Sequence, residues 1–174
     1  MIIRNIKLRK IQKTDLKYFL KWWQDKELIK LTSGIVEKSP KVLAGYFLDL
    51  LNNNKNHHYL IMLGRKAIGH VAIVHRNKNS FELNIVIGEK EYWGKGYGTL
   101  AIKHALRLVF GRLQYKKAYL EVRSDNKRAI RAYEKCGFIK KGIKKYPQNK
   151  YQPVVLRMVL YSQHQPKKFS FGSL

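Results

Sequence analysis

The sequence is poor in cysteine and contains no long apolar run. A single cysteine, Cys136, excludes an internal disulfide and provides no pattern of metal ligands. No apolar run reaches the roughly 18 residues that a membrane-spanning helix needs. Arg4 interrupts the N-terminal apolar residues before the core of a signal peptide could form. We therefore expect a soluble cytoplasmic protein that has no metal site.

Acidic residues are also scarce, because 36 lysines and arginines face 11 aspartates and glutamates, a formal net charge of +25. Such a charge could attract a nucleic acid, the ribosome or an acidic substrate. The lysines are spread along the chain, however, and no nucleic-acid-binding module is recognisable. Lys, Asn, Ile and Tyr are all abundant, which favours a compositional origin. Nucleic acid or the ribosome is therefore the less favoured partner.

The 174 residues, 45% of them hydrophobic, are enough for one domain with a substantial core. The segment that organises the chain is a strand-to-helix transition. Apolar residues alternate over 81–87, whereas from Thr99 onward they recur at helical spacing. Gly94, Gly96 and Gly98 lie between the two patterns, where the helix must begin. The free N–H groups of a helix start bind anions, most often phosphate.

Two common phosphate motifs fit this segment poorly. The P-loop needs Ser or Thr after its lysine, but Gly96 follows Lys95. The dinucleotide fingerprint needs G-x-G-x-x-G directly after the strand. Residues 93–98 instead resemble the pyrophosphate loop of the GNAT superfamily of acetyl-CoA-dependent N-acyltransferases, Q/R-x-x-G-x-G/A. Gly96 and Gly98 match this pattern, and Trp93 departs from it.

A second segment, 126–138, resembles the later GNAT motif N-x-x-A-x-x-x-Y-x-x-x-G-F. Ser124 or Asp125 is the expected N-cap of its helix, and Gly137 stands where the helix should end in a left-handed residue. Asn126 and Tyr133 are about two helical turns apart and project from the same face. Two motifs in the correct order are much more specific than either alone.

The resemblance covers residues 4–161, for which we expect a single N-acetyltransferase domain, followed by a basic tail at 162–174. The pattern predicts an α+β fold in which a mixed sheet of about seven strands is flanked by about four helices. Helices are expected to start at Thr14-Asp15, at Ser39-Pro40, near Thr99 and at the second motif. The row Leu16, Phe19, Leu20 and Trp23 is expected to be buried in the first of them. Strands are expected at 6–9, 59–63, 67–74, 81–87, 118–122, 138–143 and 154–160.

The resemblance implies that acetyl-CoA is the co-substrate. The residues expected to bind it are Ile85, Val86, Ile87, Lys95, Gly96, Tyr97, Gly98, Thr99, Asn126 and Ala129. Tyr133 matches the family's general acid, which protonates the leaving thiolate; the alternative is a packing tyrosine. Glu82 is the candidate base, and its alternative is a solvated charge on a strand face. His70 and His75 are five apart on one strand, on opposite faces, and are more typical of structural histidines.

The resulting hypothesis is an N-acetyltransferase that moves an acetyl group from acetyl-CoA to a primary amine by direct attack in a ternary complex. Residues 22–25 and 91–96 are most similar to the branch of ribosomal-protein alanine, spermidine, aminoglycoside and amino-sugar acetyltransferases. The acceptor, a small-molecule or peptide amine, stays open, as does the choice between monomer and homodimer. The alternatives are a catalytically silent RNA- or ribosome-binding protein on the same fold and a nucleotide-binding oxidoreductase.

Overall fold

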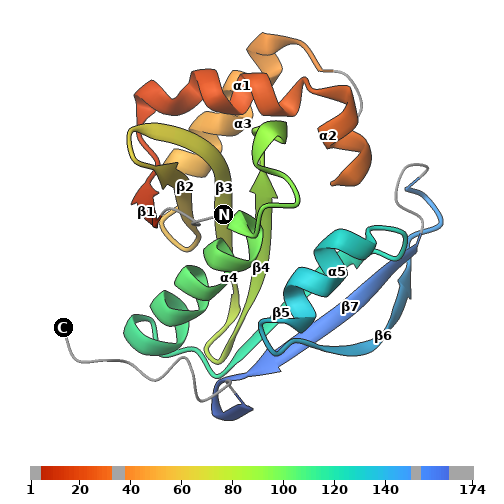
Figure 1. Cartoon of the computed structure of the whole chain (residues 1–174). Helices are drawn as coiled ribbons and strands as arrows, with labels where there is room; N and C mark the ends of the chain where they lie inside the picture. The colour runs from red at the N-terminus through yellow and green to blue at the C-terminus, as the bar shows by residue number, and fades with distance from the viewer. Residues whose placement is uncertain (1–4, 33–37, 150–153, 165–174) are drawn as a thin grey trace.

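A computed structural model describes residues 5–32, 38–149 and 154–164 (Figure 1). These residues contain one seven-stranded mixed sheet with the order β1-β2-β3-β4-β5-β7-β6. The predicted α+β class is confirmed, and each strand lies close to its predicted position. The strands are β1 (Ile6–Lys10), β2 (His57–Leu63), β3 (Lys66–Asn77), β4 (Ser80–Ile87), β5 (Lys117–Arg123), β6 (Ile139–Lys145) and β7 (Val154–Tyr161).

The described residues form five α-helices, one more than the approximate number predicted. They are α1 (Leu16–Trp23), α2 (Lys26–Leu31), α3 (Pro40–Asn52), α4 (Tyr97–Arg107) and α5 (Lys127–Glu134). The additional helix is α2, which has six residues and is too short to show clear periodicity. Asp25 starts it, because its carboxylate accepts the N–H groups of Glu27 and Leu28. None of the described helices is long and apolar enough to cross a membrane.

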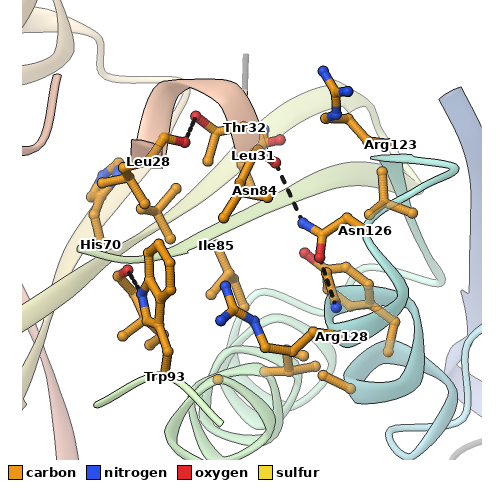
Figure 2. A pocket seen from close by; sticks show the side chains of 18 of the residues that line it. Leu28, Leu31, Thr32, His70, Asn84, Ile85, Trp93, Arg123, Asn126 and Arg128 are labelled. Atoms are coloured by element: carbon orange, nitrogen blue, oxygen red, sulfur yellow. Dashed lines mark hydrogen bonds between the residues drawn. The ribbon is translucent and has the colours of Figure 1, made fainter. Parts of the chain in front are cut away.

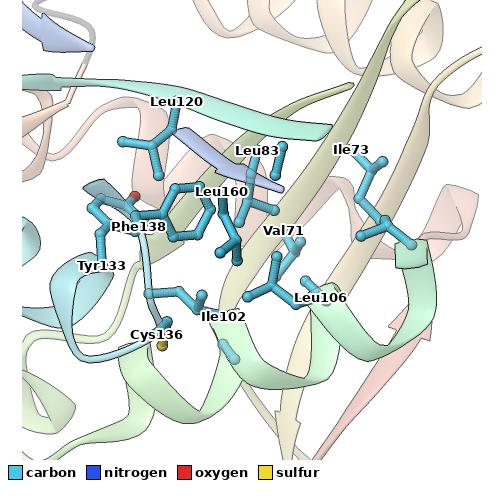
Figure 3. Packing of buried hydrophobic residues seen from close by; sticks show 14 of the residues in the cluster. Val71, Ile73, Leu83, Ile102, Leu106, Leu120, Tyr133, Cys136, Phe138 and Leu160 are labelled. Atoms are coloured by element: carbon cyan, nitrogen blue, oxygen red, sulfur yellow. The ribbon is translucent and has the colours of Figure 1, made fainter. Parts of the chain in front are cut away.

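The helices cover both faces of the sheet. Leu60 and Ile61 are adjacent on β2 and fully buried, but they point to opposite sides. Leu60 packs in one cluster with Phe19 of α1 and Phe47 of α3. Ile61 belongs to the larger cluster on the other side, which contains the buried residues of α4 and α5 (Figure 3). The sheet is therefore the middle layer of three.

The sheet divides between β4 and β5. Strands β1 to β4 form antiparallel pairs in sequence order. Strand β4 then pairs in parallel with β5 at three positions, where Ser80, Phe81 and Glu82 face residues 117–119. Beyond Glu82 the two strands run apart, as Figure 1 shows. The C-terminal part of β4 therefore has a strand partner on one edge, β3, within the described residues.

Helix α1 buries Trp22 in the core. The prediction that Trp23 is the buried tryptophan of this helix is wrong. Trp22 is 3% exposed, whereas Trp23 is half-buried. The Trp22 indole N–H donates to Glu89 Oε1 at 3.0 Å. Its ring lies against Gly88, where a Cβ would come within 2.3 Å of the indole. Contacts distant in sequence therefore choose which tryptophan faces the core, and helical periodicity alone does not contain that information.

The ends of the helices agree with the sequence in two cases and differ in one. Ser39 Oγ accepts the N–H of Val42, as predicted for a cap. Gly137 follows α5 with a φ of 90°, the left-handed conformation that was expected. The N-cap of α5, however, is Asn126 rather than Ser124 or Asp125, because its Oδ1 accepts the N–H of Ala129 at 3.1 Å. Of the predicted basic tail, residues 165–174 lie outside the described residues.

Two histidines join β2 to β3 beneath α1. His58 Nδ1 and His70 Nε2 are 3.2 Å apart, and the Phe19 ring lies 4.8 Å from the His70 ring. Burial lowers the pKa of His58 to about 4. Burial and the neighbouring His58 lower the pKa of His70 to about 3. Both rings are therefore neutral near pH 7, so that one nitrogen donates and the other accepts.

We expect this pair to make the protein sensitive to acid. The unfolded chain binds protons at these histidines below about pH 6.5, and the folded chain does so below about pH 4. The unfolded state therefore binds more protons across this window. As pH falls through it, the free energy of unfolding should decrease by at most about 1.4 kcal/mol per histidine per pH unit. Urea denaturation at pH 7, 6 and 5 measures this slope.

The variant His70→Gln should have a shallower slope, since one histidine of this buried pair is absent. His164→Gln is the matched control, because His164 is exposed. An unchanged slope in His70→Gln would show that other groups control the acid sensitivity.

Candidate active site

A cavity of about 920 Å³ opens where β4 and β5 separate. Side chains from both helical layers and from the turn before α4 line it (Figure 2). The structure brings ten of the sequence-predicted site residues to this cavity, although they come from three separate parts of the chain. They are Glu82, Ile85, Val86, Ile87, Gly96, Gly98, Thr99, Asn126, Ala129 and Tyr133.

Lys95 and Tyr97 were also predicted to bind the coenzyme, but neither lines the cavity. Tyr97 is 6% exposed and packs in the core, with its ring edge-on to Tyr92 at 5.4 Å. The Lys95 side chain is exposed to solvent. Lys95 and Tyr97 therefore contribute main-chain atoms to the turn, whereas their side chains do not line the cavity.

The turn before α4 presents free main-chain N–H groups. Gly96 is the N-cap of α4 and has a φ of 85°, a left-handed conformation that a side chain would strain. Tyr97, Gly98 and Thr99 are the first three residues of the helix, whose N–H groups have no intrahelical acceptor. A Cβ on Gly98 would meet just the Ile87 side chain, at 3.8 Å, among the described residues. The helix start therefore offers room for an anion beside positively polarised N–H groups.

The end of β4 presents main-chain groups to the same cavity. The Ile87 carbonyl accepts the indole N–H of Trp93 at 2.7 Å (Figure 2). It therefore points away from β3, and by strand alternation the main-chain groups of Ile85 point the same way. In an unsplit sheet these groups would bind β5. Here they can bind an extended ligand that lies between the two strands.

Trp93, which departs from the GNAT motif, carries a cation on its ring. The guanidinium carbon of Arg128 is 4.2 Å from the centroid of the Trp93 ring, a cation–π contact (Figure 2). Arg128 lines the cavity, and no ion pair joins it to another described residue. The sequence analysis did not select this residue, because it occupies an unspecified position of the second motif.

Tyr133 lies on α5 with its ring packed edge-on to Phe138 (Figure 3). It is 8% exposed and also lines the cavity. Burial raises the pKa of its phenol, and the neighbouring Cys136 raises it further. The hydroxyl thus stays protonated near neutral pH and can donate a proton. No hydrogen bond joins it to another residue in the described part of the chain.

Cys136 follows the same helix and is fully buried. Its Sγ donates to the main-chain oxygen of Thr99 at 3.6 Å. Burial raises the pKa of the thiol to about 11. The group is therefore a protonated packing residue rather than a nucleophile.

Asn126 connects the two sides of the cavity. Its Oδ1 caps α5, and its Nδ2 donates to the main-chain oxygen of Leu31, the last residue of α2, at 3.4 Å (Figure 2). The carbonyl contact was not anticipated, because α2 itself was not. Both polar atoms of this side chain are thus in use in the described structure.

One side of the cavity is formed by the side chains of Glu82, Asn84, Glu121 and Arg123, here called the polar face. Leu83 and Leu120 pack in the core with α4 and α5. Strand alternation therefore directs Glu82 and Glu121 to the opposite side of the sheet. Within the described residues, no group of three His, Cys, Asp or Glu side chains could hold a metal ion.

Both carboxylates of the polar face have cationic partners. Arg76, near the end of β3, donates from Nε to Glu82 Oε2 at 3.0 Å, and its Nη2 forms an ion pair with the same oxygen. Arg157 of β7 donates from Nη2 to Glu121 Oε1 at 2.6 Å. The hydroxyl of Tyr146 donates to the other oxygen of Glu121, also at 2.6 Å.

Comparison with known proteins agrees with this geometry. The family model for an acetyltransferase (GNAT) domain matches residues 5–139. The spermidine N(1)-acetyltransferase of Vibrio cholerae is 26% identical over 163 residues, which are 90% of this chain and 94% of that protein.

Solved structures also resemble the chain. The crystal structure of spermidine N-acetyltransferase from Vibrio cholerae in complex with CoA and spermine has a TM-score of 0.81 and 25% identity, covering 91% of this chain and 96% of that chain. An aminoglycoside acetyltransferase in complex with coenzyme A shares the fold with a TM-score of 0.80 at 20% identity, covering 92% of this chain and 96% of that chain. Neither the RNA-binding nor the oxidoreductase alternative gains support from these relatives.

The two motifs, the divided sheet and the family match over 5–139 agree with one another. The chain belongs to the GNAT acetyltransferase family.

Proposed function

We propose that the protein transfers the acetyl group of acetyl-CoA to a primary amine by direct attack in a ternary complex. One observation carries the proposal: a single cavity joins the start of α4, the free edge of β4 and the buried phenol of Tyr133. Its volume of about 920 Å³ suits a large extended ligand together with a second substrate. The CoA-bound relatives support the same assignment.

The residues present fit acetyl-CoA. The N–H groups at the start of α4 suit its pyrophosphate, and Arg128 on Trp93 adds a positive charge beside them. The exposed main-chain groups of Ile85 and Ile87 suit the amides of the pantetheine arm, as a neighbouring strand would. The family motif has Gln or Arg at the first position of the turn, where this chain has Trp93. Arg128 on the Trp93 ring thus places a cation near the same position.

The polar face of the cavity is then available to the acceptor amine. The ammonium must lose one proton before its nitrogen lone pair attacks the thioester carbon. As the carbon–sulfur bond breaks, the nitrogen gives its second proton to solvent and the amide forms. Tyr133 gives its phenolic proton to the departing thiolate, and its raised pKa means that the phenol carries that proton near neutral pH before the reaction. The phenol then regains a proton from solvent.

Glu82 remains our candidate for the group that accepts the amine's proton, directly or through a water molecule. It lines the cavity on the polar face, and its side chain is 14% exposed. The ion pair with Arg76 holds the carboxylate in one orientation. Asn84, the next residue on that side of β4, is an uncharged donor and acceptor that can orient the amine.

The remaining assignments rest on sequence. The cytoplasm is the location that we propose, supported by the single cysteine and the absence of a long apolar run. Monomer or homodimer is the proposed oligomeric state. The comparison proteins act on spermidine and aminoglycosides, so we propose a small amine as acceptor in preference to a nucleic-acid-bound target.

Replacing Tyr133 with phenylalanine tests the acid. The substitution removes the hydroxyl and keeps the ring against Phe138. We expect the chemical step to slow by roughly 10²- to 10⁴-fold. Acetyl-CoA affinity should be unchanged, and the free energy of unfolding should change by about 1 kcal/mol or less. A single-turnover measurement of thiol release isolates this step from product release. Tyr161→Phe, outside the cavity, is the matched control.

A Tyr133→Phe variant whose chemical step runs at the parental rate would remove Tyr133 from the mechanism. The thiolate would then depart unprotonated or take its proton from water.

Replacing Arg128 with glutamine tests the cation at the coenzyme turn. Loss of one charge-assisted contact to phosphate should weaken acetyl-CoA binding by on the order of tenfold. KM for acetyl-CoA should rise while kcat changes little, because the contact is equal in ground and transition states. Arg107→Gln removes the same charge from the exposed end of α4 and is the control. Equal coenzyme affinity in the two variants would contradict the assignment.

A further inference from the structure

A site that binds a polycation needs carboxylates that are free to pair with it. The two carboxylates of the polar face, Glu82 and Glu121, are already paired with arginines of the protein. We propose that the acceptor is a primary amine on a molecule that is otherwise neutral or negatively charged, and that Arg76 and Arg157 act as specificity residues that exclude polycations. This inference rests on the proposed acetyl transfer, and it separates the chain from relatives whose names specify spermidine or aminoglycosides.

The pairing of Glu82 is set by the strands. Arg76 lies at an irregularity in the pairing of β3 with β4, between His75 and Asn77 and two residues beyond Val74, which is opposite Glu82. Two guanidinium nitrogens bind one carboxylate oxygen, Oε2, as a charge-assisted contact. Arg76 does not line the cavity, so its charge reaches the carboxylate from outside. A substrate ammonium at Glu82 would therefore meet a carboxylate whose charge is already balanced.

The pairing of Glu121 is set in the same way from the neighbouring strand. Glu121 and Arg157 are direct register partners on β5 and β7. The Arg157 guanidinium also lies 5.2 Å from the Tyr119 ring, which fixes it between the two side chains. Lys144 of β6 lies 3.8 Å from the same Glu121 oxygen and adds a second positive charge. Neither cation lines the cavity.

The third charged residue of the polar face is Arg123, a cation, and the carboxylate nearest to it is also paired. Arg123 donates to Asp125 and forms an ion pair with it at 2.8 Å. Around the polar face, three carboxylates thus stand against four cations. The carboxylates are Glu82, Glu121 and Asp125, and the cations are Arg76, Arg123, Lys144 and Arg157.

This balance opposes a substrate with several ammonium groups. Such a substrate must either leave its second charge unpaired in a half-buried site or displace an arginine from its carboxylate. Both alternatives weaken binding, and like charges close together discriminate strongly between substrates. The net charge of +25 acts in the same direction at longer range, since it repels polycations and attracts anions.

The test compares amines that differ in charge. Glucosamine 6-phosphate and glucosamine form a matched pair that differs in one phosphate, and spermidine and kanamycin supply the polycations. Thiol release from acetyl-CoA gives kcat/KM, and calorimetry with the CoA-saturated protein gives affinity. We expect glucosamine 6-phosphate to equal or exceed glucosamine, and both to exceed the polycations by at least roughly tenfold in affinity.

Variants make the test specific to the named residues. Arg157→Gln removes the nearer of the two cations beside Glu121 and should raise the affinity for spermidine by on the order of tenfold relative to glucosamine. Arg76→Gln should do the same through Glu82. Arg65→Gln, an exposed residue of the β2–β3 turn, removes the same charge away from the cavity and should leave the ratio unchanged. Arg157 has a half-exposed side chain, so its loss should leave the fold intact.

The outcomes separate this inference from the proposed function. Polycations that bind or react better than glucosamine 6-phosphate would overturn the inference and leave acetyl transfer intact. An unchanged spermidine ratio in both Arg76→Gln and Arg157→Gln would also overturn it. Absence of thiol release with every amine, despite CoA binding, would instead refute the proposed function. In that case the amine affinities measured by calorimetry still test whether the polar face excludes polycations.

Discussion

The separation of β4 from β5 is the constraint on which the rest of the structure depends. Three residue pairs hold the strands together at one end, and beyond Glu82 the edge of β4 is released from the sheet. Main-chain groups that a sheet would normally satisfy are thereby made available to a ligand. The start of α4 follows the released end of β4 and the start of α5 follows the end of β5, and the contact of Arg128 with Trp93 brings the two GNAT motifs together across the gap. The cavity thus exists because β4 and β5 pair over part of their length, and the side chains that line it determine its chemistry.

Much of this arrangement could be predicted from sequence because it depends on local patterns. Alternation at 81–87 identified β4, and the glycines together with the helical spacing predicted a helix start near Thr99, three residues beyond the observed N-cap, Gly96. Features that depend on contacts distant in sequence could not be predicted. The short helix α2 has one clear cap and no periodicity, and Trp22 is selected over Trp23 by Gly88 and Glu89. Likewise, Glu82 could be predicted as a catalytic base or as a surface charge, but its partner Arg76 and the pairing of Glu121 with Arg157 depend on how the strands pair.

Several of the few carboxylates in the described chain hold elements of the fold together. Asp15 pairs with Arg9 and accepts the Gln12 N–H, so that it anchors the approach to α1. Glu89 accepts both Lys21 and the Trp22 indole and joins α1 to the end of β4. The many lysines and arginines therefore accompany a small number of carboxylates, several of which have defined structural partners. This explains how a chain with a net charge of +25 can still form a cavity that is nearly charge-balanced on its polar face.

The position of the aromatic residues has a spectroscopic consequence. All three tryptophans of the chain, Trp22, Trp23 and Trp93, line the same cavity. Trp93 is in contact with a guanidinium and hydrogen-bonded to the end of β4, whereas Trp22 is bonded to a buried carboxylate. Tryptophan emission, excited selectively at wavelengths where tyrosine does not absorb, therefore originates at the site where substrates are proposed to bind. An unlabelled sample carries its own optical reporter of occupancy, and single Trp→Phe replacements can assign the signal to either end of the cavity.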